Sequence, residues 1–221
     1  SNFMIELYLI RHAESVKNLK PEFIGGRSNY SDLSKKGIEQ AKLLGQRFEY
    51  EGINFDEVYC SPALRTKRTL EIVLPNYQGD VLIDDRLQEL DEGDWTGRLR
   101  EEVHNQEALG LMDKDSWNFV PPNGESQSMV GARMKSWLKD YILIKTQDAK
   151  IALFGHGLAI KCLLKEIMNF DSNLTWRIYL GNTSITRLDY QPDKMRWSLD
   201  RVNDMTHLYN LNHVPSNSHI L

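Results

Sequence analysis

Short apolar runs alternate along the chain with longer segments in which apolar side chains recur every three or four residues. A short run bounded by turn residues is typical of a buried strand, and the longer spacing is typical of a helix packed on a sheet. Strands are expected over residues 4–10, 55–60, 81–83 and 150–154. Helices are expected over residues 34–50, 62–74, 126–141 and 158–168. This repeated strand–helix order predicts an α/β fold with a mostly parallel sheet.

Two regions depart from this alternation. Residues 184–199 alternate between apolar and polar side chains and predict a hairpin that turns near residues 191–193. The last strand or two are therefore expected to run antiparallel. Residues 95–124 are polar and irregular, which predicts a partly helical excursion. Within it, residues 98–122 are expected to cover a substrate pocket.

Composition and charge narrow the classes of protein. A chain of 221 residues with 41% hydrophobic residues can bury one sizeable core, so we expect a single domain over 4–210 and a tail over 211–221. The net charge of −4 gives no general reason to bind nucleic acid or an anionic membrane. No apolar run approaches the roughly 18 to 20 residues of a membrane span, and no signal peptide is evident. We therefore expect a cytoplasmic location, with Cys60 and Cys162 as reduced, buried thiols.

Charged and polar side chains follow two of the predicted strands directly. The first strand ends in L-I-R-H-A-E-S, which contains Arg11 and His12, and a later one ends in A-L-F-G-H-G, which contains His156. Ligands bind at the carboxyl ends of strands in such sheets, so these are the first candidates for a functional site. Neutral imidazole is a nucleophile for phosphorus, and a guanidinium matches the oxygens of a phosphate.

Further motifs add candidate residues to those at the two strand ends. S-P-A-L-R-T places Arg65 on the first turn of a helix that follows a strand, where an anion is favoured. L-Q-E places Glu89 just after the third strand. The pair Glu125 and Ser126 precedes the next helix and is expected to cap it.

Taken together, these segments resemble the histidine phosphatase superfamily, in the branch that contains cofactor-dependent phosphoglycerate mutases and fructose-2,6-bisphosphatase-like enzymes. The resemblance extends from Leu9 to the segment 203–208, and Ala13 stands where the family usually has glycine. It implies a three-layer α/β/α sandwich of the phosphoglycerate mutase-like type. The central sheet would be mostly parallel, with an antiparallel strand near the C-terminus.

The resemblance also implies a role for each site residue. His12 would attack the phosphoryl group and carry it covalently, and Glu89 would be the general acid and base. Arg11 and His156 would complete the catalytic set, and the substrate-binding set would be Asn18, Gly25, Arg65 and Gly157. A carboxyl donates a proton near neutral pH only if its pKa is raised. Burial of Glu89, or a neighbouring carboxylate at Glu14, Asp91 or Glu92, is expected to raise it.

No recognised metal or cofactor motif accompanies these residues. The sequence lacks an H-E-x-x-H motif and a Walker A motif, so neither a metal nor a cofactor is expected. The two arginines, Asn18 and His156 would supply donors to the phosphate instead. The segment Gly155–Gly157 mimics half of a dinucleotide-binding fingerprint, but the third glycine is absent and the motif lies late in the chain.

We expect hydrolysis of a small phosphorylated metabolite, with phosphate as the product. One alternative is a phosphoglycerate mutase, which returns the phosphoryl group to an acid. Such mutases carry a tandem arginine pair before residue 121, whereas residues 104–120 contain no arginine. A phosphoprotein phosphatase is a further alternative. No nucleic-acid or membrane partner is expected, and the sequence does not indicate an oligomeric state.

Overall fold

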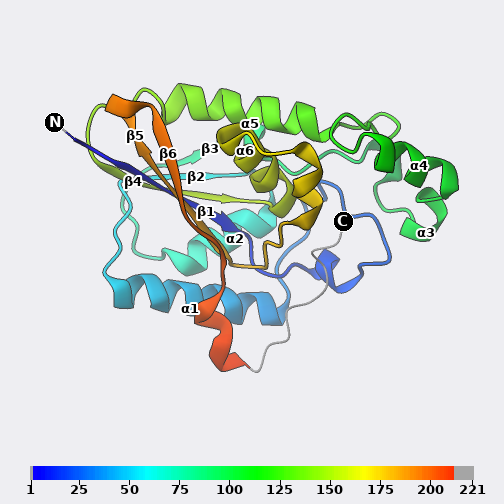
Figure 1. The fold of residues 1–221 in the computed structure, drawn as a ribbon. Helices are drawn as coiled ribbons and strands as arrows, with labels where there is room; N and C mark the ends of the chain where they lie inside the picture. The colour runs from blue at the N-terminus through cyan, green and yellow to red at the C-terminus, as the bar shows by residue number, and fades with distance from the viewer. Residues whose placement is uncertain (1, 212–221) are drawn as a thin grey trace.

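A six-stranded sheet runs through the centre of the protein in the order β3-β2-β4-β1-β5-β6 (Figure 1). The computed structural model describes residues 2–211, so the predicted tail lies almost wholly outside the described residues. The strands are β1 (Ile5–Arg11), β2 (Glu57–Cys60), β3 (Val81–Ile83), β4 (Ala149–Gly155), β5 (Ile185–Gln191) and β6 (Arg196–Asp204).

Strands β1 and β4 lie side by side at the centre of the sheet. They pair in parallel from Ile5 opposite Ala149 to Arg11 opposite Gly155. Strand β2 is parallel to β4 and β3 is parallel to β2, whereas β5 runs antiparallel to both β1 and β6. The predicted mostly parallel sheet and its C-terminal antiparallel hairpin are confirmed. Because β1 and β4 end level with each other, the residues that follow them are brought together.

Four long helices cover the two faces of the sheet, which makes the three layers that the sequence predicted (Figure 1). They are α1 (Lys35–Glu51), α2 (Leu64–Val73), α5 (Gln127–Tyr141) and α6 (Gly157–Met168). Alternate residues of β1 divide between the two faces, as the two-residue period of a strand requires. Leu7 and Leu9 join the core under α5 and α6, and Tyr8 and Ile10 join the core over α1 and α2.

Helix boundaries follow from local chemistry. The Ser34 hydroxyl accepts a hydrogen bond from the Gly37 amide at 3.0 Å and caps α1, which ends where Gly52 adopts a φ of 66°. Asn169 ends α6 in the same left-handed conformation, with a φ of 52°. Short 3₁₀ helices lie at Val16–Leu19, Asp85–Leu87, Gly93–Trp95, Ser172–Arg177, Pro192–Lys194 and Thr206–Leu211.

The predicted excursion contains two short helices, α3 (Arg100–Val103) and α4 (Gln106–Lys114), which project from one end of the sheet (Figure 1). Its small apolar cluster comprises Ile24, Trp95, Val103 and Ala108. Ile24 belongs to the loop after β1, so this cluster attaches the excursion to that loop. None of the helices described is long and apolar enough to cross a membrane.

Candidate active site

His12 and His156 meet at the carboxyl ends of the two central strands. His12 follows β1 and His156 follows β4, and their ring centroids lie 5.4 Å apart with the planes inclined by 61°. The His12 amide also donates to the carbonyl of Gly155 at 3.0 Å, which continues the pairing of the strands. The sheet register therefore brings together two residues that are 144 positions apart in sequence.

The hydrogen bonds of His12 define its tautomer. Its Nδ1 lies 2.7 Å from the carbonyl oxygen of Ala13, which can only accept, so Nδ1 carries the proton. Its Nε2 accepts from Arg65 Nε at 3.3 Å. Burial lowers the pKa of His12 well below its ordinary value, and the nearby Arg65 and Arg11 charges lower it further. His12 is therefore a neutral imidazole with the lone pair of Nε2 directed at a guanidinium.

Arg65 is held in place from several sides. Its Nη1 donates to the carbonyls of Arg27 and Ser28 at 2.8 and 2.9 Å, and its Nη2 donates to His156 Nδ1 at 3.1 Å. It lies on the first turn of α2, as the sequence predicted. Burial lowers its pKa to about 10, which leaves the guanidinium charged at neutral pH. Arg65 thus places a fixed positive charge between two histidines.

His156 is fully buried, and both of its ring nitrogens contact the protein. Nδ1 accepts from Arg65, so Nε2 carries the proton and donates to the hydroxyl of Ser61 at 2.8 Å. Burial and the adjacent Arg65 lower the pKa of His156 well below its ordinary value. The structure places His156 behind Arg65 and does not include it among the residues that line the cavity.

Arg11 is also buried, with its guanidinium packed over Gly157. Its Nη1 donates to the carbonyl of Leu180 at 2.7 Å, and burial lowers its pKa to about 10. A Cβ atom on Gly157 would lie 3.3 Å from Arg11 Nε and 3.4 Å from Cδ. Gly157 therefore leaves room for the Arg11 side chain. It is not among the residues that line the cavity, and its expected contact with substrate stays a prediction.

The carboxylate of Glu89 lies at the N-terminus of α6. Its oxygens accept hydrogen bonds from the amides of Leu90, Leu158 and Ala159 at 2.9, 3.1 and 3.0 Å. Three such donors hold the carboxyl group of Glu89 in one orientation at the start of the helix. Glu89 lies in the loop that follows β3, whereas α6 follows β4. The contact between Glu89 and α6 could therefore not be inferred from the residues next to Glu89 in sequence.

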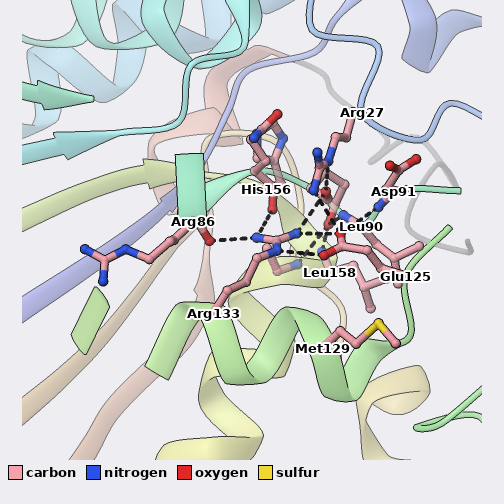
Figure 2. A network of polar contacts seen from close by, with 12 residues as sticks. Arg27, Arg86, Leu90, Asp91, Glu125, Met129, Arg133, His156 and Leu158 are labelled. Carbon is pink, nitrogen blue, oxygen red and sulfur yellow. Dashed lines mark hydrogen bonds and ion pairs between the residues drawn. The ribbon is translucent and has the colours of Figure 1, made fainter. Parts of the chain in front are cut away.

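Arg133, Glu125 and Arg27 form a network of charged residues (Figure 2). Arg133 donates from α5 to the carbonyls of Gln88 and Glu89 at 2.7 and 3.1 Å, and it pairs with Glu125 at 2.9 Å. Arg27 also pairs with Glu125, at 3.1 Å. The expected capping pair is therefore only half right. Ser126 caps α5 through the amide of Met129, but Glu125 is the anion that joins these two arginines.

A cavity of about 140 Å³ opens in front of these groups. Asn18 and Gly25, both predicted, line it from the loop after β1. The Asn18 side chain is oriented because its Oδ1 accepts from the Ser15 amide at 2.9 Å. The amide Nδ2 of Asn18 donates no hydrogen bond to another residue within 2–211. Of the predicted site residues, Arg11, His12, Asn18, Gly25, Arg65 and Glu89 line the cavity.

Three charged lining residues were not predicted as part of the site, namely Lys17, Glu92 and Arg100. The sequence placed Glu92 only as a neighbour that would raise the pKa of Glu89. In the structure burial raises the pKa of Glu92 itself, to about 7, with Glu89 and Asp91 contributing. Each of the three residues sits in a loop or at a helix start, where no periodicity distinguishes a lining side chain from a solvated one.

Two other features of the described residues bear on the choice of site. No group of three or more histidine, cysteine or carboxylate side chains within residues 2–211 is arranged to hold a metal ion. A larger hollow of about 740 Å³ lies between α1 and the segment after α2. None of its lining residues is a histidine or an arginine, so the smaller cavity is the candidate active site.

Comparisons with known proteins agree with the fold. The family model described as "Histidine phosphatase superfamily (branch 1)" matches residues 7–205. "Probable phosphoglycerate mutase GpmB" of Erwinia tasmaniensis is 33% identical over 93% of this chain and 95% of its own length. The protein of the same name from Serratia proteamaculans is 31% identical with the same coverage.

Solved structures give the same fold. Phosphoserine phosphatase of Entamoeba histolytica, in complex with 3-phosphoglyceric acid, superposes with a TM-score of 0.79 at 24% identity, covering 92% of this chain and 99% of that chain. Alpha-ribazole phosphatase of Shigella flexneri superposes with a TM-score of 0.76 at 24% identity, covering 90% and 96%. The family match and the curated relatives together show that the chain belongs to branch 1 of the histidine phosphatase superfamily.

Proposed function

We propose that the protein hydrolyses a small phosphate monoester through a covalent phosphohistidine on His12. The observation that carries this proposal is the state of His12: a neutral ring whose unprotonated Nε2 lines a cavity with Arg11 and Arg65. A neutral imidazole attacks phosphorus, whereas an imidazolium does not. Two buried guanidinium groups beside it supply the charge that a phosphate dianion needs.

The first half-reaction transfers the phosphoryl group to the protein. The Nε2–P bond forms as the ester P–O bond breaks, and the leaving alkoxide takes a proton from Glu89. Arg11, Arg65 and Asn18 donate to the non-bridging oxygens, with Gly25 beside them in the cavity wall. His156 holds Arg65 Nη2 from behind, so its proposed part is to set the direction of that guanidinium.

The second half-reaction returns the phosphoryl group to water. Glu89, now ionised, accepts a proton from a water molecule whose oxygen attacks phosphorus as the Nε2–P bond breaks. Inorganic phosphate then leaves. The three amide donors around Glu89 hold its carboxyl group in place for this step.

Phosphoryl transfer between phosphoglycerates is the second candidate, since the curated relatives are named as probable mutases. Arg100 supports it as a cationic group in the cavity that the sequence did not predict there. Hydrolysis is preferred because the excursion adds only this one arginine to the lining. A single arginine provides less support for holding an intermediate bisphosphate than an arginine pair would.

The test is a substrate panel assayed in EDTA with the wild-type protein and His12→Gln. The panel contains p-nitrophenyl phosphate, small phosphometabolites, and 3-phosphoglycerate with 2,3-bisphosphoglycerate. We expect the wild type to release phosphate, and we expect a folded His12→Gln variant to release none. An acid-labile phosphoenzyme should form only with the wild type. Isomerisation without release would show a mutase, and full activity of His12→Gln would refute the mechanism.

A further inference from the structure

Thr183 contacts the backbone of His12 from a strained conformation. Its φ of 60° is rare for a β-branched residue, and the residue is fully buried. From this position its amide donates to the carbonyls of Arg11 and His12 at 3.0 and 3.3 Å. The side-chain amide of Asn182 donates to the same His12 carbonyl at 3.1 Å. Two donors from the loop before β5 therefore hold the carbonyl of His12.

A chain of hydrogen bonds reaches Thr183 from the end of the described residues. The Thr183 hydroxyl donates to the carbonyl of Asn182 at 2.6 Å and lies 3.0 Å from Nε2 of His207. Nδ1 of His207 lies 3.2 Å from Nη1 of Arg47, which can only donate, so Nε2 carries the proton and donates to Thr183. Burial lowers the pKa of His207 to about 4, which keeps the ring neutral at pH 7.

The segment 203–207 is itself attached to the loop before β5 and to α1. The Gly181 amide donates to Asn203 Oδ1 at 2.7 Å. Both oxygens of Asp204 accept from Arg47, at 2.9 and 2.6 Å. The guanidinium at the head of the chain of hydrogen bonds is therefore fixed by an ion pair.

This arrangement ends on the residue that would attack phosphorus. A strained backbone persists only where the surrounding structure fixes it, and such positions cluster at functional sites. Displacement of a nucleophile from its line of approach is costly in rate. We propose that Thr183 and His207 are positioning residues: His207 holds the Thr183 hydroxyl, and Thr183 fixes the carbonyl of His12 so that its imidazole keeps its line of attack. This inference rests on the proposed role of His12 as the nucleophile.

Substitutions of similar shape test the hydroxyl of Thr183. Thr183→Val keeps the branched side chain but removes both hydrogen bonds of the hydroxyl, whereas Thr183→Ser keeps the hydroxyl. We expect kcat for p-nitrophenyl phosphate to fall at least about tenfold in Thr183→Val, with KM little changed, and to stay within about threefold in Thr183→Ser. The matched control is Thr175→Val, which removes a buried hydroxyl bonded to Gln127 at 2.8 Å. An equal loss of kcat in this control would overturn the positioning role.

His207→Leu tests the other end of the contact. Leucine neither accepts from Arg47 nor donates to Thr183, so kcat should fall by about the same factor as in Thr183→Val. His207→Gln, whose amide can still donate to the hydroxyl, should recover most of this loss. The double variant Thr183→Val/His207→Leu should be no slower than Thr183→Val, because the two residues act through one contact. Losses that multiply in the double variant would show that His207 does not act through Thr183.

A spectroscopic measurement separates this inference from the proposed reaction. The carbonyl carbon of His12 responds to the hydrogen bonds that its oxygen accepts, and triple-resonance NMR reads its shift through the amide of Ala13. We expect this resonance to move upfield in Thr183→Val and in His207→Leu, and to stay in place in Thr175→Val. The same shifts in a protein whose wild type hydrolyses no ester would refute the reaction and leave the contact. An unmoved resonance in both variants, or an unchanged kcat in both, would overturn the inference.

Discussion

Arg65 Nε donates to His12 Nε2 across 3.3 Å, so the proposed nucleophile is hydrogen-bonded directly to a proposed phosphate-binding group. In the proposed reaction, a phosphate entering the cavity takes both partners at once, with its phosphorus opposite Nε2 and an oxygen on the guanidinium. The same guanidinium holds His156, which keeps its fork in a single orientation. Proximity of this kind lowers the cost of reaching the attacking geometry.

Arg65→Lys tests this relationship. Lysine keeps the charge but cannot donate to His12, His156 and two carbonyls together, since it lacks the rigid fork. We expect kcat/KM for p-nitrophenyl phosphate to fall by about 100-fold, in the range for loss of one oriented donor to transition-state charge. Steady-state kinetics with a circular-dichroism check of folding is the measurement. A loss below threefold would show that charge alone suffices.

Glu89→Gln tests the proposed role of Glu89 as the proton donor. Glutamine retains the size of the side chain but cannot protonate an alkoxide, so esters with poor leaving groups should lose about 100-fold or more in kcat. p-Nitrophenyl phosphate should lose much less, because its leaving group departs without a proton. The measurement is kcat across a series of esters with increasing leaving-group pKa. Equal losses across the series would assign Glu89 to positioning.

Gly157→Ala tests the close contact with Arg11. The added Cβ would lie 3.3 Å from Arg11 Nε, so the guanidinium must move by a few tenths of an ångström. We expect kcat/KM to fall by about tenfold, since small displacements in an active site are costly. Gly110→Ala in α4 is the matched control, because nothing lies within 4 Å of its added Cβ. Equal kinetics for the two variants would contradict the contact.

Arg133→Met tests the network in Figure 2. The substitution leaves Glu125 and the carbonyls of Gln88 and Glu89 without this donor. We expect the free energy of unfolding to fall by about 2 kcal/mol, measured by urea denaturation, with reduced kcat as Glu89 loses its support. Lys135→Met on the same helix removes only an exposed pair at 3.8 Å and should change stability by less than about 0.5 kcal/mol.

Stability should depend on pH through the two buried histidines. Their folded-state pKa values lie well below the ordinary 6.5, so below pH 6.5 the unfolded chain binds more protons than the folded one. The free energy of unfolding should therefore fall as pH drops from 6.5 to 5, by up to about 1.4 kcal/mol per pH unit for each histidine. Glu92, whose pKa is raised to about 7, opposes this with the reverse sign.

Urea denaturation of the wild type and His12→Asn at pH 5, 6 and 7 is the measurement. The variant lacks one depressed histidine, so its free energy of unfolding should decline less steeply between pH 6 and 5. The same slope in both proteins would show that His12 titrates at its ordinary value. His156 and Glu92 are present in both proteins, so their contributions cancel in the comparison.

Much of the fold was predictable because the residues within each helix and strand specify that element. The apolar run of β1 and the three-to-four-residue spacing of apolar side chains in α1 each predict which side chains are buried. Ser34 marks the start of α1 because its side chain caps the helix. The histidines could be placed near one another because strand ends share one edge of a parallel sheet. Gly157 follows the end of β4, as expected, and its contact with substrate stays a prediction.

The sequence by itself determined the order of strands and helices, the residues at the strand ends and the nucleophile motif, since each depends on neighbours within a few positions. Tertiary structure alone decided that Glu89 accepts from the start of α6, that Glu125 joins Arg27 to Arg133, and that Glu92 enters the cavity. These contacts join residues brought together by the packing of the sheet, its helices and the loops at its edge. Periodicity and motif spacing carry no information about such distances, because burial and charge arise only when the layers pack.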